Sequence, residues 1–231
     1  MAQKATKPNG KLGVMVVGLG AVTSTFMTGV LMARKGLAKP VGSMTQYDKI
    51  RVGRGNDKKY LHYKDIVPLA DLNDIIFGAW DVYPVNAYQA AMNAQVLKEK
   101  DIEPVRDELE QIVALPAAFD HNYAKRLDGD NIKKAADRWD MTEQIREDIR
   151  AFKARTGVER VVVLWAASTE VYVPVDKDVH YTLEALEKAM RADDKEHIAP
   201  SMCYAYAALK EGAPFIMGAP NTTVDIPAMW E

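Results

Sequence analysis

Short apolar runs alternate with amphipathic stretches along most of this 231-residue chain. The runs at 14–17, 75–81, 160–165 and 215–217 have the length and hydrophobicity of strands that are buried on both faces of a sheet. The amphipathic stretches between them have the spacing of helices. Strands that alternate with helices predict an α/β fold with a parallel sheet, in which ligands bind beyond the carboxyl ends of the strands.

The most sharply marked helix is expected at 141–156. Its apolar residues recur every three or four positions, so they form one stripe on the helix surface. Asp140 and Glu143 have the spacing of a capping box, and Gly157 suits the C-cap. The other helices are expected at 22–38, which Lys39-Pro40 ends, at 87–98 after Asn86, at 104–115, after Thr182, and at 201–210 before Gly212.

Two stretches are harder to interpret. Residues 43–74 are mixed, with a basic, glycine-containing part at 53–55, and no element is assigned there. Residues 116–140 are largely polar, so we expect them to form a surface excursion.

A glycine-containing turn, Gly18-Leu19-Gly20-Ala21-Val22-Thr23, stands between the first strand and the first helix. At such a turn, glycines let backbone N–H groups and a helix N-terminus approach a diphosphate. Thr23 occupies the position of the third glycine of the common fingerprint, and the acidic residue usual about 20 positions later is not clear. The turn is therefore either a dinucleotide-binding loop or a tight turn with packing glycines.

Two further strand ends carry polar residues. Asp81 ends the strand at 75–81, as a ligand-binding carboxylate or as a cap or loop residue. Ala166-Ala167-Ser168-Thr169 follows the strand at 160–165, as a binding turn or an ordinary one. Because the carboxyl ends of parallel strands share one edge of the sheet, we predict a Rossmann-type dinucleotide-binding domain over 1–231, with a glycine-rich strand–helix unit at 12–38.

Composition excludes several other classes of protein. Thirty basic and thirty-two acidic residues leave a net charge of -2, so there is no basic field for nucleic acid or a membrane surface. The apolar run near the start is too short for a secretory or membrane segment. Cys203, the one cysteine, suggests a buried thiol in a reducing, cytoplasmic compartment. The four histidines lack metal-ligand spacing, so no metal site is expected.

Three stretches together resemble the inositol-1-phosphate synthases, in particular the bacterial branch. They are Gly18-Leu19-Gly20 with its following helix, the run QIREDIRAFKARTGVERVVVLWAASTE at 144–170, and the run IAPSMCYAYAALKEGAPFIMGAPNTTVDIPA at 198–228 together with Trp80-Asp81. These matches occur in the expected order and correspond to the amino-terminal half of the family's proteins.

The resemblance implies NAD as the cofactor. It carries NAD contact to Gly18, Gly20, Ala21, Val22, Asp81, Ala166, Ala167, Ser168, Thr169 and Gly218. The eukaryotic members have two asparagines in place of Ala21 and Val22, and an asparagine in place of Met217. Polar side-chain contacts are therefore not expected at these three positions.

The implied reaction converts glucose 6-phosphate to 1L-myo-inositol 1-phosphate, for inositol and phospholipid biosynthesis, with NAD reduced and reoxidised in one turnover. The family's catalytic lysines lie in a segment that would follow Glu231, so the catalytic residues are unknown here. The 231-residue chain alone is therefore expected to be inactive, and its sheet is expected to be incomplete. The resemblance also implies a homotetramer. Two alternatives stay open: a nicotinamide-dependent dehydrogenase that releases reduced cofactor, and a non-catalytic nucleotide-binding module.

Overall fold

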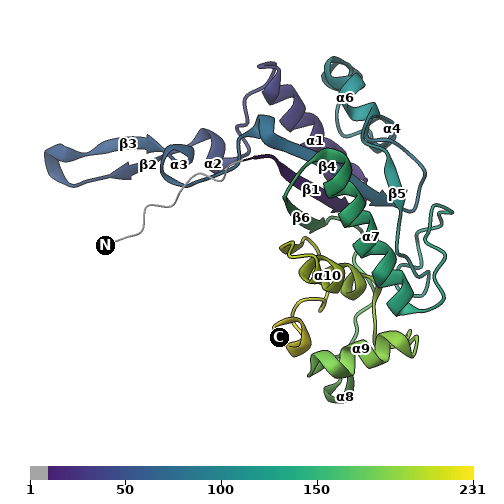
Figure 1. Ribbon diagram of the computed structural model, residues 1–231. Coiled ribbons are helices and arrows are strands. Elements are labelled where there is room, and N and C mark those ends of the chain that lie inside the picture. Colours follow the sequence, from purple (N-terminus) through teal and green to yellow (C-terminus); the bar gives the residue numbers. More distant parts are fainter. Residues whose placement is uncertain (1–9) are drawn as a thin grey trace.

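The computed structural model describes residues 10–231 and is built around a parallel five-stranded sheet (Figure 1). Its strands are β1 (Leu12–Val17), β4 (Ile75–Asp81), β5 (Ala114–Pro116), β6 (Arg160–Trp165) and β7 (Phe215–Met217). All four strands expected from the apolar runs are present, so the prediction of an α/β fold with a parallel sheet is confirmed. The expectation for residues 1–9, within the polar start of the chain, lies outside the described residues.

The strand order is β5-β4-β1-β6-β7, so the chain adds strands first on one side of β1 and then on the other. Val17, at the end of β1, is in register with Trp80 of β4 and with Trp165 of β6. The carboxyl ends of the three central strands are therefore level. A reversal of strand order at such an edge leaves the crevice in which doubly wound proteins bind their ligands.

Helices cover both faces of this sheet (Figure 1). Successive residues of β1 point to opposite faces, because Met15 and Val17 belong to one buried core and Val16 to the other. The Val16 core includes residues of α1, α4 and α6, and the other core includes residues of α7, α9 and α10. The helices are α1 (Ala21–Arg34), α2 (Met44–Tyr47), α3 (Tyr63–Ile66), α4 (Ala87–Ala94), α5 (Glu99–Ile102), α6 (Arg106–Glu110), α7 (Arg138–Thr156), α8 (Lys177–His180), α9 (Leu183–Arg191) and α10 (Pro200–Lys210).

Several helix ends differ from the sequence-based prediction. Helix α1 ends at Arg34 rather than near residue 38, because Gly36 follows with φ +70°. Helix α4 ends at Ala94 rather than at 98, since Gln95 adopts the left-handed conformation. At the start of α7, Asp137 and not Asp140 is the N-cap, and its carboxylate accepts from the Asp140 amide at 2.7 Å.

The stretch expected as one helix at 104–115 is instead a 3₁₀ turn at Glu103–Val105, the short helix α6 and the edge strand β5. A proline in the first turn separates the 3₁₀ turn from the preceding helix α5, and three strand residues are too few for an apolar run to show.

A two-stranded antiparallel hairpin occupies the stretch in which no element was assigned. Strands β2 (Lys49–Val52) and β3 (Lys59–His62) project away from the main sheet, on the left of Figure 1. Every residue of β2 is exposed, as is every residue of β3 except His62. Neither face of the hairpin is covered by the described chain, which explains why no alternation of buried and exposed positions marks it in the sequence.

The segment 116–140 has no helix or strand between the end of β5 at Pro116 and the start of α7 at Arg138, but it is not wholly a surface excursion. Ala117, Ala118 and Tyr123 are buried in the core that contains α7 and α10. The Ala118 amide donates to the Tyr204 hydroxyl at 2.8 Å. The segment therefore forms part of the domain's interior, and it also lies beside the carboxyl ends of β1, β4 and β6.

Candidate functional site

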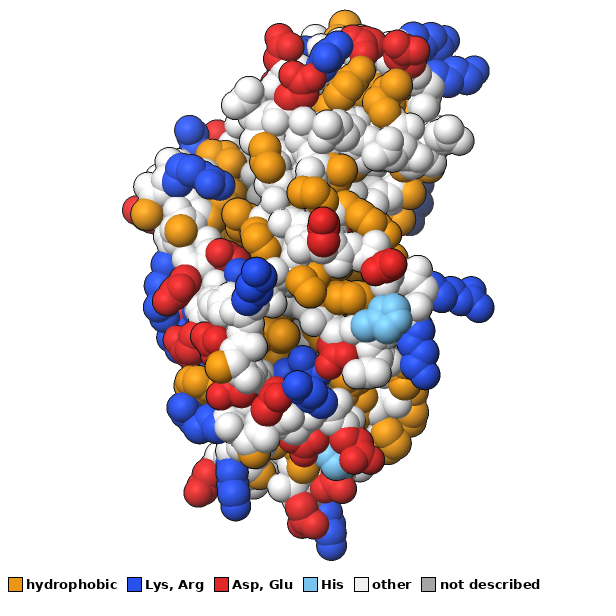
Figure 2. Space-filling view, turned by 90° about the vertical axis from the view of Figure 1, so that its right-hand side faces the viewer, with side chains coloured by type: hydrophobic (Ala, Val, Ile, Leu, Met, Phe, Trp, Pro, Cys, Tyr) orange, Lys and Arg blue, Asp and Glu red, His pale blue; other side chains and the backbone are white. Residues whose placement is uncertain are grey.

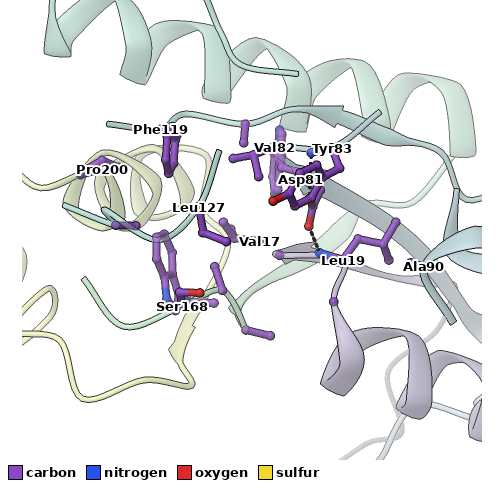
Figure 3. Close-up of a pocket in the computed structure, with 18 of the residues that line it drawn as sticks. Val17, Leu19, Asp81, Val82, Tyr83, Ala90, Phe119, Leu127, Ser168 and Pro200 are labelled. Carbon is purple, nitrogen blue, oxygen red and sulfur yellow. Dashed lines mark hydrogen bonds between the residues drawn. The ribbon is translucent and has the colours of Figure 1, made fainter. Parts of the chain in front are cut away.

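A cavity of about 730 Å³ lies beyond the carboxyl ends of β1, β4 and β6. Figure 3 shows its walls: Leu19 and Asp81 face each other across the end of the sheet, Ser168 lies below, and Phe119 and Pro200 lie opposite. The predicted residues that line it are Gly18, Gly20, Ala21, Val22, Asp81, Ala166, Ala167 and Ser168. Three strand ends that are far apart in sequence thus form one site.

The turn after β1 is shaped by Gly18 and Thr23. Gly18 has φ +93°, and a Cβ atom there would lie 2.7 Å from the Ala167 Cα, so only glycine fits. Thr23, which replaces the third fingerprint glycine, is fully buried and donates from Oγ1 to the Gly18 carbonyl at 2.6 Å. Gly18 therefore has the packing role that was one of the two interpretations, and Thr23 holds the turn closed.

Gly20 has a different environment. It is the N-cap of α1, its φ is -97°, and a Cβ atom there would meet nothing within 4 Å. No side chain caps this 14-residue helix, and Ala21 and Val22 are exposed at its start. The free N–H groups and the positive end of the helix dipole therefore open to the cavity, as an anion-binding site requires.

Asp81 connects β4 to the glycine turn. Its Oδ2 accepts from the Leu19 amide at 2.6 Å, and its Oδ1 accepts from the Tyr83 amide at 2.9 Å. Burial raises the pKa of Asp81, while the amide donors of Tyr83 and Leu19 act in the opposite direction. Helix α4 is capped by Asn86, so the interpretation of Asp81 as that helix's cap is wrong. Asp81 is a loop-fixing carboxylate that also faces the cavity.

The turn after β6 contributes Ala166, Ala167 and Ser168 but not Thr169, which is exposed and does not line the cavity. Gly218 does not line it either. Its amide donates to the Trp165 carbonyl at 3.0 Å, and a Cβ atom at Gly218 would lie 2.3 Å from that oxygen. Within this structure, Gly218 is a glycine because β7 and the end of β6 approach each other closely.

Glu170 lines the cavity and was not predicted from the sequence. Its side chain is buried, Oε1 accepts from the Ser201 amide in the first turn of α10 at 3.0 Å, and Oε2 lies 3.4 Å from Asn221 Nδ2. Burial raises the pKa of Glu170 to about 7, against the opposing hydrogen bond from Ser201. Its partners are 31 and 51 residues away, and the one signal in the sequence is its place directly after the polar turn.

The pKa of Glu170 predicts a pH-dependent stability. The folded chain holds this proton up to about pH 7, whereas an unfolded glutamate releases it near pH 4.3. The folded state therefore binds more protons in this window, and the free energy of unfolding should fall as pH rises through it. Glu170→Gln should remove that fall, which urea unfolding at several pH values would measure. The exposed Glu196→Gln is the matched control, and a fall of equal size in all three proteins would contradict the assignment.

The cavity is acidic. Asp81, Asp120 and Glu170 line it, and no lysine, arginine or histidine is among its lining residues in the described part of the chain. Three lysine or arginine side chains line the adjoining cavity, and all three are paired: Lys133 with Asp148 at 2.6 Å, Arg138 with Asp120, and Lys195 with Asp193 at 2.9 Å. An anionic group in the first cavity would therefore depend on backbone N–H groups.

The strand order and the uncapped helix N-terminus at a glycine turn define a dinucleotide-binding domain of the doubly wound class. A family model described as myo-inositol-1-phosphate synthase, an NAD-binding model, matches residues 12–231. The chain belongs to the myo-inositol-1-phosphate synthase family, and NAD is the cofactor that this family's domain binds. The resemblance found in the sequence is thereby confirmed.

Relatives agree with this assignment. The chain is 61% identical to inositol-3-phosphate synthase 1 of Bacteroides thetaiotaomicron, and the match covers all of this chain and 53% of that protein. It is 36% identical to inositol-3-phosphate synthase 1 of Oryza sativa, with 95% of this chain and 46% of that protein covered. The crystal structure of inositol-3-phosphate synthase from Caenorhabditis elegans superposes with a TM-score of 0.89, at 30% identity, over 96% of this chain and 47% of that one. The chain thus spans about half the length of these relatives.

Four other features that would indicate a function are a metal site, a membrane-spanning helix, a surface of one charge and a reactive cysteine. Within residues 10–231, no three histidine, cysteine, aspartate or glutamate side chains are grouped to hold a metal ion, and no helix has the length and hydrophobicity to cross a membrane. Acidic and basic side chains are interspersed on the face shown in Figure 2, without a field of one sign. Cys203 is fully buried, and burial raises the pKa of its thiol to about 11, as for a structural cysteine.

Proposed function

We propose that this chain is the NAD-binding part of an inositol-3-phosphate synthase, which isomerises glucose 6-phosphate to inositol phosphate. The observation that carries the proposal is the uncapped N-terminus of α1, which opens at Gly20 onto the cavity in a domain of this family. Calorimetric titration of the purified chain with NAD tests it: one site per chain supports the proposal, and no binding contradicts it.

The proposed roles follow from the chemistry of each wall. N–H groups at Gly20, Ala21 and Val22 would hold the diphosphate, and Asp81 would accept from ribose hydroxyls. Ala166, Ala167 and Ser168 would face the other half of the cofactor across the crevice. When bound, NAD supplies a hydride acceptor that returns the hydride within the same turnover. We keep contacts from Thr169 and Gly218 in the proposal on the family resemblance alone.

Asp81→Asn is expected to lower NAD affinity about tenfold, because a carboxylate accepts hydrogen bonds from ribose hydroxyls more strongly than an amide does. Asparagine has one acceptor oxygen, so one of the bonds to the Leu19 and Tyr83 amides is lost, and we expect stability to fall by about 1 kcal/mol. Calorimetry and urea unfolding measure the two effects.

Asn86→Ala is the matched control for the loss of stability. Asn86 caps α4 and does not line the cavity, so its removal should also cost about 1 kcal/mol of stability but leave NAD affinity unchanged. Equal affinity losses in the two variants would mean that Asp81 acts through stability, and the proposed ribose contact would be wrong.

The absence of cations among the described lining residues bears on the substrate. Glucose 6-phosphate carries a phosphate, for which the acidic cavity offers no positively charged partner. We propose that lysines in the part of the family's proteins that this chain does not span bind the phosphate and act as the acid–base groups. A dehydrogenase would instead release NADH, and a non-catalytic module would bind NAD with no turnover in any longer form.

We also propose that the protein is a homo-oligomer. Ile50, Val52, Tyr60 and Leu61 are exposed on the β2–β3 hairpin, and isolated two-stranded hairpins are marginally stable in water. A second copy of the chain would cover these side chains. We further propose that the protein is a tetramer, that it is cytoplasmic, and that it takes part in inositol and phospholipid biosynthesis.

A further inference from the structure

The indole of Trp165 is a buried donor without a partner. Trp165 is the last residue of β6, the residue is 4% exposed, and its Nε1 atom has no hydrogen-bond acceptor in the described part of the chain. The other buried indole of the sheet differs in this respect, because Trp80 Nε1 donates to Asp148 Oδ2 at 2.7 Å. A buried N–H group without an acceptor is unfavourable and uncommon in folded proteins, so it indicates a partner that is not part of the chain.

Trp165 belongs to the wall of the cavity. The Tyr204 ring packs edge-on against its indole, with centroids 5.9 Å apart, and thereby fixes the indole plane. Nearby parts of the wall are apolar, from Ala118, Phe119 and Pro200. An apolar wall of this kind suits a flat, weakly polar ring that carries one or two polar atoms.

The position of β6 indicates which half of the cofactor reaches Trp165. The diphosphate site is at the end of β1, and the ribose-binding carboxylate Asp81 is at the end of β4, on one side of β1. Trp165 is at the end of β6, on the other side. A dinucleotide that crosses the crevice with its adenosine half at β4 has its nicotinamide half at β6.

The polar groups on that side are mainly acceptors. Asp120 presents a carboxylate, and Glu170 presents a carboxyl group that holds its proton up to about pH 7; their oxygens suit the hydroxyl and amide N–H donors of a nicotinamide nucleoside. The carboxamide oxygen is an acceptor, and it needs a donor. We propose, on the basis of the proposed function, that Trp165 Nε1–H donates a hydrogen bond to the carboxamide oxygen of the nicotinamide and so selects the nicotinamide half of NAD.

The test compares three ligands on a chain that lacks only this N–H group. Trp165 is replaced by β-(3-benzothienyl)alanine, which keeps the two fused rings but has sulfur in place of N–H, and Trp165→Phe is a second variant. NAD affinity should fall roughly three- to tenfold in the benzothienyl variant. Affinity for ADP-ribose, which has no nicotinamide, should stay within about twofold. 3-Acetylpyridine adenine dinucleotide keeps the carbonyl oxygen and should show the same loss as NAD.

Trp230→Phe is the matched control, because Trp230 is 79% exposed, its Nε1 donates to the Val224 carbonyl, and it does not line the cavity. Equal loss of NAD and ADP-ribose affinity in the benzothienyl variant would overturn the inference, and so would no loss of either. Equal affinities of the wild-type chain for ADP-ribose and for NAD would also overturn it, while the proposed nucleotide site would still stand. A wild-type chain that binds neither would refute the proposed function itself.

Discussion

Gly20→Val should lower NAD affinity by at least about tenfold and leave the fold intact. The φ of Gly20 is open to any residue, and a Cβ atom there meets nothing within 4 Å, so the side chain adds no strain to the unliganded protein. The added methyl groups would occupy the space in front of the α1 N-terminus, where the diphosphate has to approach the N–H groups. Calorimetry with NAD measures the affinity, and urea unfolding checks the fold.

Gly29→Val is the matched control. Gly29 lies in the same helix, away from the cavity, and a Cβ atom there also meets nothing within 4 Å. One variant places a β-branched residue at the N-cap of α1 and the other within the helix, but Gly29→Val should bind NAD as the wild type does. Unchanged NAD affinity in a folded Gly20→Val variant would show that the diphosphate does not bind at this turn.

A polypeptide of residues 1–231 should make inositol phosphate from glucose 6-phosphate and NAD at least several orders of magnitude more slowly than a full-length relative does. The described cavity has no lysine, arginine or histidine to bind phosphate or transfer a proton, and acid–base groups alone contribute about 10²- to 10⁴-fold. Loss of the electrostatic stabilisation of charge in the transition state lowers the rate further.

The full-length Bacteroides thetaiotaomicron relative, assayed at equal concentration, is the positive control for this measurement. NAD titration of residues 1–231 in the same buffer shows that the polypeptide is folded and competent to bind. Equal turnover by the two proteins would mean that catalytic groups lie within these residues, and the division of roles proposed above would be wrong.

The sheet and the place of the site could be predicted from the sequence because each depends on local patterns. Strands buried on both faces are continuous apolar runs, and their carboxyl ends coincide in a parallel sheet. Gly20, Asp81 and Ser168 could therefore be assigned to one edge without knowledge of distances. Gly157 was recognised as the C-cap of α7, and its φ of +69° agrees.

Other features depend on contacts between distant segments and left no local pattern. Gln95 adopts φ 54° although glutamine carries no bias toward that conformation, so the end of α4 was misplaced. The partners of Glu170, Ser201 and Asn221, are 31 and 51 residues away. The missing acceptor of Trp165 Nε1 likewise cannot be read from neighbouring residues in the sequence. The loop role of Asp81 was among the interpretations from the sequence, but its partner could not be predicted, since the bond to the Leu19 amide spans 62 residues.

The central claim, that NAD lies across the carboxyl edge of the sheet, is tested most directly by a crystal structure of this chain grown with saturating NAD. We expect the diphosphate within hydrogen-bond distance of the N–H groups at Gly20–Val22, a ribose hydroxyl on Asp81, and the nicotinamide at the end of β6. NAD bound at any other place on the chain, with this cavity empty, would contradict the claim.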